Sequence, residues 1–557
     1  MWCIRAMRVC VVLAIAGLGV VASARAATTP PPLIVPAVAV SESGAAVAWT
    51  AGGVVQTASM KPDGTFGRGE GVGRAFDGRP PQLVLGPGGD ELLLWQSGNA
   101  LRSAFRAAGQ AGWTFETVAS GVNVNEAPCL VMDATGRAIA SWVGLDATGD
   151  RSALLVSTRS AAGWSAPAAL ATTVFEASMA SDTAGDVAVA YLTPPVTPGL
   201  TAGSMEVWAA TLPSGATTWT APEQISGSDS VRGYLRVVGG GARTFVAAWG
   251  SWNSLQNDRP LARAARLRIP GTWSAPGDVL PQIPNPAPTP IPVGPFAGEW
   301  TIGVDGLGDA LAVLPFPTPT MGEGLGVTHL AAGEDAWAPP AVLAFPDRKY
   351  GVDLVPAIGF GDDGTATLAF VQIDVSMSRV RVVTAPDPLG VWPGLAPSID
   401  TIAGPDAGLN PPAMALGSRT GVIAVQLARG DVIVFARTAP GARWTPPQTL
   451  RSTGATTGYL LSAHVKKGIV RVMVNCGIPP CTGDVVLEAA LRTGRRRLGR
   501  VAFDLRASGT ISRAIVLPTW TRLRFRHGRH LLTHLAFDVR EGDGASEQIQ
   551  RTIRLHG

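Results

Sequence analysis

Apolar residues in this chain fall into short runs that are separated by tight polar turns. In the clearest stretch, Glu126–Thr172, the turn Asp133–Gly136 follows one apolar run and precedes a strand that alternates between two faces. A two-residue alternation is typical of a β-strand rather than a helix. The four strands predicted for this unit are Pro128–Met132, Arg137–Trp142, Ala153–Arg159 and Trp164–Leu170.

Both faces of these predicted strands carry apolar or small residues. A lone antiparallel sheet would keep one face polar against water. Stacking similar sheets around an axis buries both faces, which is the solution of a β-propeller. The segment Trp164–Pro167 suits an outer edge strand, because its proline cannot donate to a ladder.

Two landmarks recur along the chain and count the units. A tryptophan unit ends each one, at Trp164, Trp219, Trp273, Trp337 and Trp444, with weaker copies at Trp113 and Trp392 and Phe66 as the first. The second landmark is the residue six positions after the tight turn of each unit. Its members are Trp49, Trp95, Trp142, Tyr191, Trp249, Leu314, Phe370 and Gln426. The spacing of about 50 residues predicts an all-β propeller of eight four-stranded blades. Seven blades with one misread unit is the alternative.

The tryptophan unit stops after residue 450, and alternating strands replace it. Six or seven strands in about 100 residues predict a small β-sandwich. They fall over Ile469–Val474, Asp484–Ala489, Gly499–Asp504, Ser512–Leu517, Leu531–Val539 and Gln548–Leu555. The predicted domains are therefore a propeller over 33–452 and a sandwich over 457–557.

The first 26 residues have the pattern of a secretory signal peptide. Arg5 and Arg8 precede an apolar run, and Ala24–Ala26 offers a small-residue cleavage site. The alternative, a membrane anchor, is disfavoured because the run falls short of the ~20 residues that a spanning helix needs. We predict a secreted or envelope-associated protein with no transmembrane segment after cleavage and a Pro-rich segment at 27–32.

Secretion also bears on whether the cysteines form disulfides. Cys476 and Cys481 flank a short Gly-Ile-Pro-Pro segment, and disulfides persist outside the cell. We predict a disulfide between them, since no further cysteine or histidine at ligand spacing supports a metal site. Cys129 lies in an apolar strand and is expected to be a buried, inert thiol.

The two faces of the predicted propeller differ in their loops. The loops between the second and third strands are long at Leu192–Ser204, Gly250–Pro260 and Pro315–Gly326. The loop Gln282–Pro295, which precedes a first strand, is also long. These connections all emerge on one face, where binding usually sits. That face also receives the start of each innermost strand, where charged or polar residues stand at Arg79, Glu126, Glu176, Arg232, Glu299, Asp353 and Asn410. We hypothesise that this ring binds a glycan, peptide or protein; the alternative is charge that serves solubility alone.

The sequence supports catalysis or a bound cofactor less than it supports ligand binding. A glycosidase or lyase needs only two opposed carboxylates, which the same ring of residues could supply, so a carbohydrate-active enzyme is the alternative function. His329 is the only histidine in the repeats and lies in no Gly-x-Ser-x-Gly elbow. The recurring turn aspartates, Asp133, Asp182 and Asp305, are expected to cap backbone rather than bind calcium. No phosphate loop or dinucleotide fingerprint occurs, and we predict no cofactor and no metal.

Charge separates the two predicted domains. Of the chain's 45 lysines and arginines, 18 lie in residues 451–557, against 7 acidic residues there, and the repeats are acidic. Aromatic residues are sparse beside Arg495–Arg497 and Arg522–Arg526, which disfavours single-stranded nucleic acid as a partner. A solvated surface and contact with an anionic cell-wall polymer remain as the two interpretations.

The repeat region resembles the secreted sialidase-like (BNR-like) propellers of bacteria. Its turns read Asp-x-x-Gly in place of that family's Ser-x-Asp-x-Gly-x-Thr-Trp box, and the family's arginine triad and tyrosine nucleophile have no matching positions here. The resemblance therefore implies the propeller fold, and the sialidase activity does not carry over. The tail, with its Cys476–Cys481 hairpin and Arg-rich turns, is similar to the Ig-like modules of secreted actinobacterial proteins.

Overall fold

The computed structural model describes residues 35–555 with gaps. The gaps are 76–78, 121, 123–126, 146–151, 196–203, 254–258, 280–299, 318–322, 345–350, 353–355, 375–376, 391, 393–399, 402–408, 428–429, 452–463, 467, 477–480, 492–493, 506–508, 522–530 and 541–545. The predicted signal peptide and Pro-rich segment lie outside the described residues.

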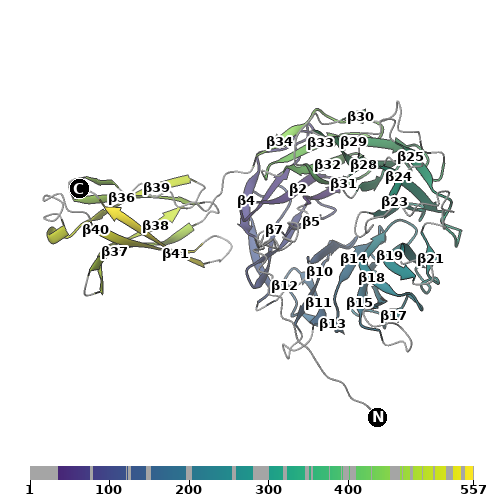
Figure 1. The fold of residues 1–557 in the computed structure, drawn as a ribbon, viewed down its shortest axis with the longest axis horizontal. Helices are drawn as coiled ribbons and strands as arrows, with labels where there is room; N and C mark the ends of the chain where they lie inside the picture. Colours follow the sequence, from purple (N-terminus) through teal and green to yellow (C-terminus); the bar gives the residue numbers. More distant parts are fainter. Residues whose placement is uncertain are drawn as a thin grey trace, which may run out of the picture. The chain divides into compact units, whose positions relative to one another are not determined.

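Eight antiparallel sheets follow one another along the first part of the chain, which confirms the predicted propeller (Figure 1). Blade 1 comprises β1 (Ala37–Ser41), β2 (Gly44–Ala51), β3 (Val54–Ser59) and β4 (Glu70–Arg74). Blade 2 comprises β5 (Gln82–Leu85), β6 (Glu91–Ser97), β7 (Ala100–Arg106) and β8 (Thr114–Ala119). Blade 3 comprises β9 (Cys129–Met132), β10 (Ala138–Leu145), β11 (Ser152–Ser160), β12 (Gly163–Trp164) and β13 (Ala168–Thr172). Blade 4 comprises β14 (Ala177–Ser181), β15 (Val187–Thr193), β16 (Glu206–Leu212) and β17 (Glu223–Gln224).

The second half of the ring repeats this order. Blade 5 comprises β18 (Val231–Gly239), β19 (Thr244–Asn253), β20 (Arg259–Arg268) and β21 (Gly277–Asp278). Blade 6 comprises β22 (Thr301–Val304), β23 (Ala310–Pro317), β24 (Glu323–Leu330) and β25 (Ala341–Ala344). Blade 7 comprises β26 (Gly351–Val352), β27 (Ala357–Phe360), β28 (Ala366–Asp374), β29 (Met377–Ala385) and β30 (Asp400–Thr401). Blade 8 comprises β31 (Leu409–Leu416), β32 (Gly421–Leu427), β33 (Val432–Arg437) and β34 (Gln448–Leu450).

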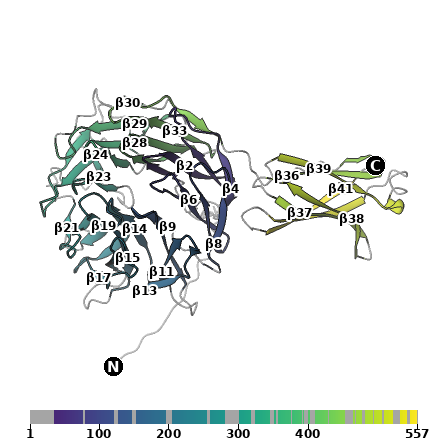
Figure 2. The ribbon, with the colours of Figure 1, turned by 180° about the vertical axis from the view of Figure 1, so that it is seen from behind.

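The ring closes by packing between blade 8 and blade 1, each of which is built from one continuous stretch of chain. The first strands of successive blades contact one another around the axis, and β1 contacts β31. The purple first blade accordingly lies beside the green eighth blade when the ring is viewed from either side (Figures 1 and 2). The Gln448 amide donates to the Phe66 carbonyl and accepts the Phe66 N–H, both at 2.8 Å. Gln426 donates to the Thr50 carbonyl at 2.7 Å, so two glutamines fasten the closure.

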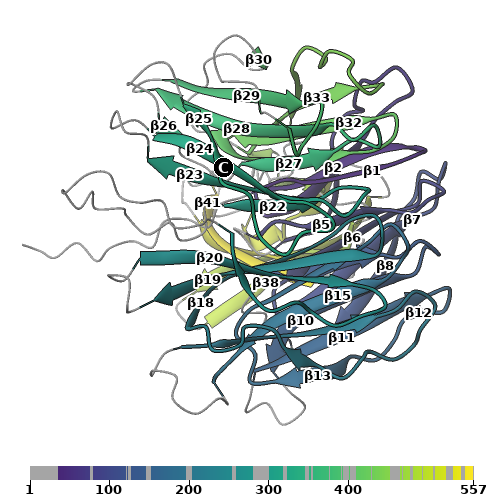
Figure 3. The same ribbon diagram turned by 90° about the vertical axis from the view of Figure 1, so that its right-hand side faces the viewer.

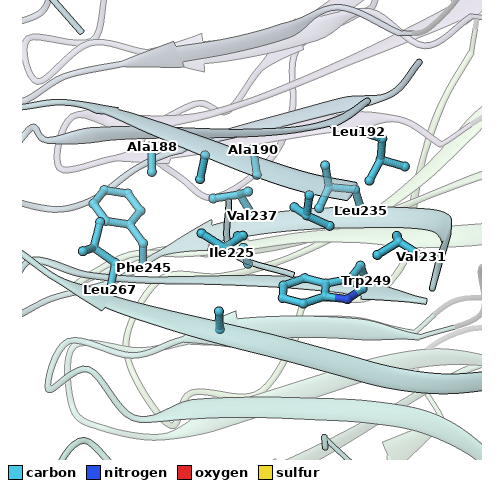
Figure 4. Packing of buried hydrophobic residues seen from close by; sticks show 14 residues of the cluster. Ala188, Ala190, Leu192, Ile225, Val231, Leu235, Val237, Phe245, Trp249 and Leu267 are labelled. Atoms are coloured by element: carbon cyan, nitrogen blue, oxygen red, sulfur yellow. The ribbon is translucent and has the colours of Figure 1, made fainter. Parts of the chain in front are cut away.

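The second landmark residue occupies the same place in every blade. All eight members lie on the second strand and are at most 6% exposed. Figure 4 shows one of them, Trp249, packed among apolar side chains of blades 4 and 5 such as Val231 and Leu235. Because neighbouring sheets share each such cluster, the landmark marks the blade interface, as the alternation pattern predicts.

Three consecutive glycines at the end of β18 allow unusually close approach between blades. A Cβ added to Gly239 would lie 2.5 Å from the Ser181 carbonyl oxygen, and one on Gly241 would lie 1.9 Å from that of Gly306. The Gly241 N–H donates to the Asp305 carbonyl at 2.8 Å. Blades 5 and 6 are therefore joined by backbone hydrogen bonding that a side chain would block.

The tryptophan unit turns out to precede the outer strand rather than to form it. In blade 3, Ser165–Pro167 separates β12 from β13. The residue after the tryptophan binds the third strand at two points: the Thr445 N–H donates to the Ala436 carbonyl at 2.8 Å, and the Thr445 hydroxyl oxygen accepts the Ala436 N–H at 3.0 Å. Ser165, Thr220 and Ser274 repeat this arrangement. The hydroxyl thus supplies an acceptor for the third strand where the following segment leaves the ladder.

Two of the predicted long loops are largely strand. The ladder of β19 and β20 extends to Asn253 and Arg259, and that of β23 and β24 to Pro317 and Glu323. Figure 3 shows the corresponding ends of β20 and β23 on the same side of the ring. The flanks of the predicted loops at Gly250–Pro260 and Pro315–Gly326 are therefore strand on the expected face, while 254–258 and 318–322 lie outside the described residues.

The C-terminal part forms two sheets, as the predicted β-sandwich requires. One contains β35 (His464–Lys466), β36 (Ile469–Cys476) and β39 (Gly509–Val516); the other contains β37 (Cys481–Leu491), β38 (Gly494–Leu505), β40 (Leu531–Arg540) and β41 (Ser546–Leu555). β36 and β37 belong to different sheets, so Cys476 and Cys481 do not flank a hairpin as expected. Their side chains lie outside the described residues, and the disulfide stays a prediction.

Candidate functional site

The described members of the predicted ring lie where the sequence places them. Arg79 and Glu176 precede β5 and β14, while Arg232 and Asn410 lie near the starts of β18 and β31. Glu126, Glu299 and Asp353 lie outside the described residues, and so does the side chain of Arg232. The structure therefore describes only part of the ring, and the ring as one binding site stays a prediction.

Two of these residues support the scaffold. The Asn410 side-chain amide donates to the Gln426 carbonyl at 3.0 Å, within blade 8. The carbonyl of Arg79 accepts the hydroxyl of Thr50 at 3.1 Å, between blades 1 and 2. The Asn410 side chain therefore satisfies backbone, a role that the sequence could not distinguish from ligand binding, whereas the Arg79 contact is made by backbone alone.

Glu176 holds an irregular segment of the neighbouring blade. Its Oε1 accepts the Leu235 N–H at 3.0 Å. The Ser178 hydroxyl accepts the Val237 N–H, also at 3.0 Å, so β14 binds alternate residues of β18. The register of β18 against β19 shifts on both sides of Gly233. The carboxylate thus satisfies backbone that the bulge removes from the ladder.

Tyr234 lies in this bulge with a strained backbone. Its φ is +62°, a region that bulky residues rarely occupy, and its side chain is 40% exposed. A Cβ added to Gly250 would lie 3.2 Å from the Tyr234 ring, so the glycine leaves room for the ring. Strain of this kind persists only where surrounding contacts enforce it, and it gathers at functional sites.

Two further exposed apolar residues lie on the same face of the ring. Phe175, 51% exposed, directly precedes Glu176, and Leu145, 38% exposed, ends β10 in blade 3. Arg236 is also exposed and follows Tyr234 by two residues on β18, with Leu235 buried between them. The face at blades 3 to 5 therefore presents two exposed aromatic residues, Phe175 next to Glu176 in the chain and Tyr234 two places before Arg236. We call Phe175, Glu176, Tyr234 and Arg236 the aromatic site.

The sequence indicated Glu176 as a ring residue but gave no indication of Phe175 or Tyr234. Phe175 lies one position before the predicted ring residue, and Tyr234 lies two positions after Arg232. The bulge shifts the register, so strand alternation could not show which side of β18 Tyr234 would take. The only available signal was a bulky residue next to Gly233, a glycine with φ of +119°.

Cys129 is a free thiol that is partly buried, rather than fully buried as the sequence predicts. Its thiol contacts the Ala177 carbonyl at 3.9 Å and is partly buried in β9. Burial raises the pKa of the Cys129 thiol, and a hydrogen bond from Met179 backbone and the charge of Arg236 offset only part of that effect. A raised thiol pKa disfavours the reactive thiolate.

The opposite face is built from turns that the aspartates cap. Oδ1 of Asp133 accepts the N–H groups of Thr135 and Arg137, both at 2.9 Å. Asp182 and Asp305 bind their own turns in the same way. Burial raises the pKa of Asp182 and of Asp305; at Asp133 hydrogen bonds from Thr135 and Arg137 outweigh burial and lower it. These oxygens therefore serve turn geometry, as expected.

The described residues lack two further kinds of feature. No group of three or more histidine, cysteine, aspartate or glutamate side chains there is arranged to hold a metal ion. Within the same residues, no helix has both the length and the apolar composition needed to cross a bilayer.

Comparison with known proteins gives only distant structural likeness. No protein-family model matches the chain, and no curated protein does. A polysaccharide lyase of family PL25, an ulvan lyase bound to -[GlcA(1-4)Rha3S]-, is 9% identical with a TM-score of 0.45, covering 74% of this chain and 95% of its own. The BP39L lectin from Burkholderia pseudomallei is 14% identical with a TM-score of 0.41, covering 66% and 97%. At these values the likeness does not establish function, and the propeller fold rests on the sheets themselves.

Proposed function

We propose that this protein is a secreted or envelope-associated glycan-binding propeller that uses the aromatic site. The observation that carries the proposal is Tyr234, an exposed aromatic residue in a strained bulge that the Glu176 carboxylate fixes. An aromatic ring offers a flat apolar surface to a sugar ring, and Tyr adds a hydroxyl. Glu176 and Arg236 both bind the backbone of the intervening Leu235, through Oε1 at 3.0 Å and Nη1 at 3.3 Å, and so fix the bulge that presents the tyrosine.

Binding to a glycan array tests this proposal directly. Tyr234→Asn removes the ring, and asparagine tolerates the left-handed backbone at this position. We expect the Kd of glycans bound by the wild type to rise about tenfold or more, the loss of one well-placed aromatic contact. Phe175→Ala should weaken the same glycans.

Leu307→Ala is the matched control, because Leu307 is 70% exposed in a turn of the opposite face. Equal affinity in the wild type, Tyr234→Asn and Phe175→Ala would contradict the proposal, as would an array to which the wild type does not bind. Release of reducing or unsaturated ends by the same preparation would favour the alternative, a carbohydrate-active enzyme.

We also propose that the sandwich contacts an anionic cell-wall polymer. Arg495, Arg496, Arg497 and Arg500 are exposed on β38, and the Arg496 guanidinium lies 5.1 Å from the centre of the Trp520 ring. Arg500 pairs with Asp484, which leaves the other three arginines as the positive surface of this strand. The Ig-like character of the module remains part of the proposal.

Retention on isolated cell walls measures this contact in the full chain. Arg495→Glu combined with Arg497→Glu should abolish retention, and about 0.5 M salt should release the wild type because salt screens exposed charges. Arg79→Glu, a charge reversal in the propeller, is the control. Retention that resists both the reversal and the salt would refute an electrostatic contact.

A further inference from the structure

In blades 2 and 3, one position of the third strand carries an arginine in place of an apolar residue. This position pairs with the second-strand residue that lies four places before the landmark: Arg106 pairs with Glu91, and Arg159 pairs with Ala138. The other six blades have an apolar residue there, namely Met60, Leu212, Leu267, Leu330, Ala385 and Ala436. The scaffold therefore does not require arginine at this position.

Between blades 1 and 2 the arginine is fully matched by carboxylates. Arg106 pairs with Glu70 of blade 1 and with Glu91 of its own blade, the latter at 2.7 Å. It donates to the Ser59 hydroxyl at 3.1 Å, and its guanidinium lies 4.2 Å from the centre of the Trp113 ring. Two carboxylates thus surround one guanidinium in this interface.

The equivalent arginine between blades 2 and 3, Arg159, has one carboxylate partner fewer than Arg106. Arg159 pairs with Glu116, the counterpart of Glu70, at 2.6 Å and lies 4.2 Å from the centre of the Phe105 ring. Ala138 stands where blade 2 has Glu91, and Phe105 stands where blade 1 has Ser59. Within the described residues Arg159 makes this single ion pair, although a guanidinium has five N–H donors.

A cavity opens at the place of the missing carboxylate. Its volume is about 370 Å³, within the range of small-molecule sites, and Arg159 lines it together with Leu92, Phe105, Met132 and Ala138. Asp90 is the acidic residue in the wall, and its Oδ1 accepts the Ala108 N–H at 2.8 Å. A second arginine, Arg137, also lines the cavity, and its Nε pairs with Asp133 at 2.8 Å, so the wall combines two arginines, an apolar surface and a hydrogen-bond acceptor.

We propose that this cavity binds a small ring-bearing carboxylate, whose carboxylate takes the place of Glu91 beside Arg159. The ring would lie on Leu92 and Phe105. The Asp90 carboxylate would accept hydrogen bonds from ring hydroxyls, which favours a hexuronate over an aromatic acid such as benzoate. This site lies on the tight-turn side of the ring and does not depend on the aromatic site.

Calorimetric titration of the full chain with D-glucuronate, D-glucose and benzoate tests the proposal. We expect D-glucuronate to bind, benzoate to bind more weakly and D-glucose not to bind. Arg159→Leu installs the residue found in blades 4, 5 and 6, so the fold should persist while the glucuronate Kd rises at least about tenfold. Ala138→Glu restores the second carboxylate and should exclude glucuronate while raising the Tm.

Two controls separate the possible outcomes. Tyr234→Asn should leave glucuronate binding unchanged, so failure of the aromatic site and of this cavity are distinguishable. Stronger binding of benzoate than of glucuronate would overturn the hexuronate assignment. A glucuronate Kd that is the same in the wild type and in Arg159→Leu, or no binding to the wild type, would overturn the site itself.

Discussion

Replacing Gly241 by alanine is expected to destabilise the propeller more than any other single methyl addition considered. The new Cβ would lie 1.9 Å from the carbonyl oxygen of Gly306 and 2.4 Å from its carbonyl carbon. Both are backbone atoms, so no side chain can rotate away, and the blades must separate. That movement would break the 2.8 Å hydrogen bond from Gly241 to Asp305. We expect a loss on the order of 3 kcal/mol or more in the free energy of unfolding.

Chemical denaturation followed by tryptophan fluorescence measures this loss as a lower midpoint. Gly306→Ala is the matched control, because a Cβ on that side of the same contact meets nothing within 4 Å. Its effect should stay within about 0.5 kcal/mol, typical of exposed sites. Similar midpoints for the two variants would show that blades 5 and 6 are not held as closely as the structure places them.

The periodic features of the fold were predictable because each blade solves the same packing problem. Trp49, Trp142 and Trp249 must fill equivalent interfaces, so their spacing carries the blade count. The turns were predictable for a related reason: Gly136 and Gly185 have φ of +82° and +86°, which glycine adopts without strain. Arg243 takes such a conformation at the equivalent turn position of blade 5, which has no glycine.

The departures from periodicity were not predictable, because they depend on neighbours distant in sequence. Tyr234 is exposed only because Glu176, 58 positions earlier in the chain, holds the bulge through the next residue, Leu235. The cavity at Arg159 exists because Ala138 replaces a glutamate that blade 2 retains. A single repeat shows neither fact, and both emerge when equivalent positions are compared across blade interfaces.

The Asp186–Arg243 pair joins blades 4 and 5 at the tight-turn face. Asp186 is fully buried and accepts two hydrogen bonds from Arg243, at 2.6 and 2.9 Å, and one from the Ser214 N–H at 2.7 Å. Asp186→Asn removes the charge and places an amide against the guanidinium. Because the charge-assisted hydrogen bonds are lost while the half-exposed guanidinium of Arg243 stays hydrated, we expect a loss of about 1–3 kcal/mol at pH 7.

Asp182→Asn, in the same turn, is the matched control with the opposite expectation. Asp182 Oδ2 is buried and has no hydrogen-bond partner among the described residues. Burial raises the pKa of Asp182, and the neighbouring Asp186 charge raises it further. The asparagine keeps an oxygen for the turn N–H groups and removes a buried charge, so its stability should equal or exceed that of the wild type at pH 7.

The pH dependence of unfolding separates the two aspartates. Burial raises the pKa of Asp186, but hydrogen bonds from Arg243 and the Ser214 N–H outweigh it, so the folded-state pKa lies below the usual value. The stability that Asp186 contributes is therefore present above about pH 4, the unfolded value, and is lost as the pH falls through the folded pKa. The deficit of Asp186→Asn should thus be constant near neutrality and shrink below pH 4. For Asp182, whose folded pKa is raised, any advantage of the asparagine should appear as the pH rises above about 4. A deficit of Asp186→Asn that is unchanged down to pH 3 would show that its carboxylate does not carry the contact between blades.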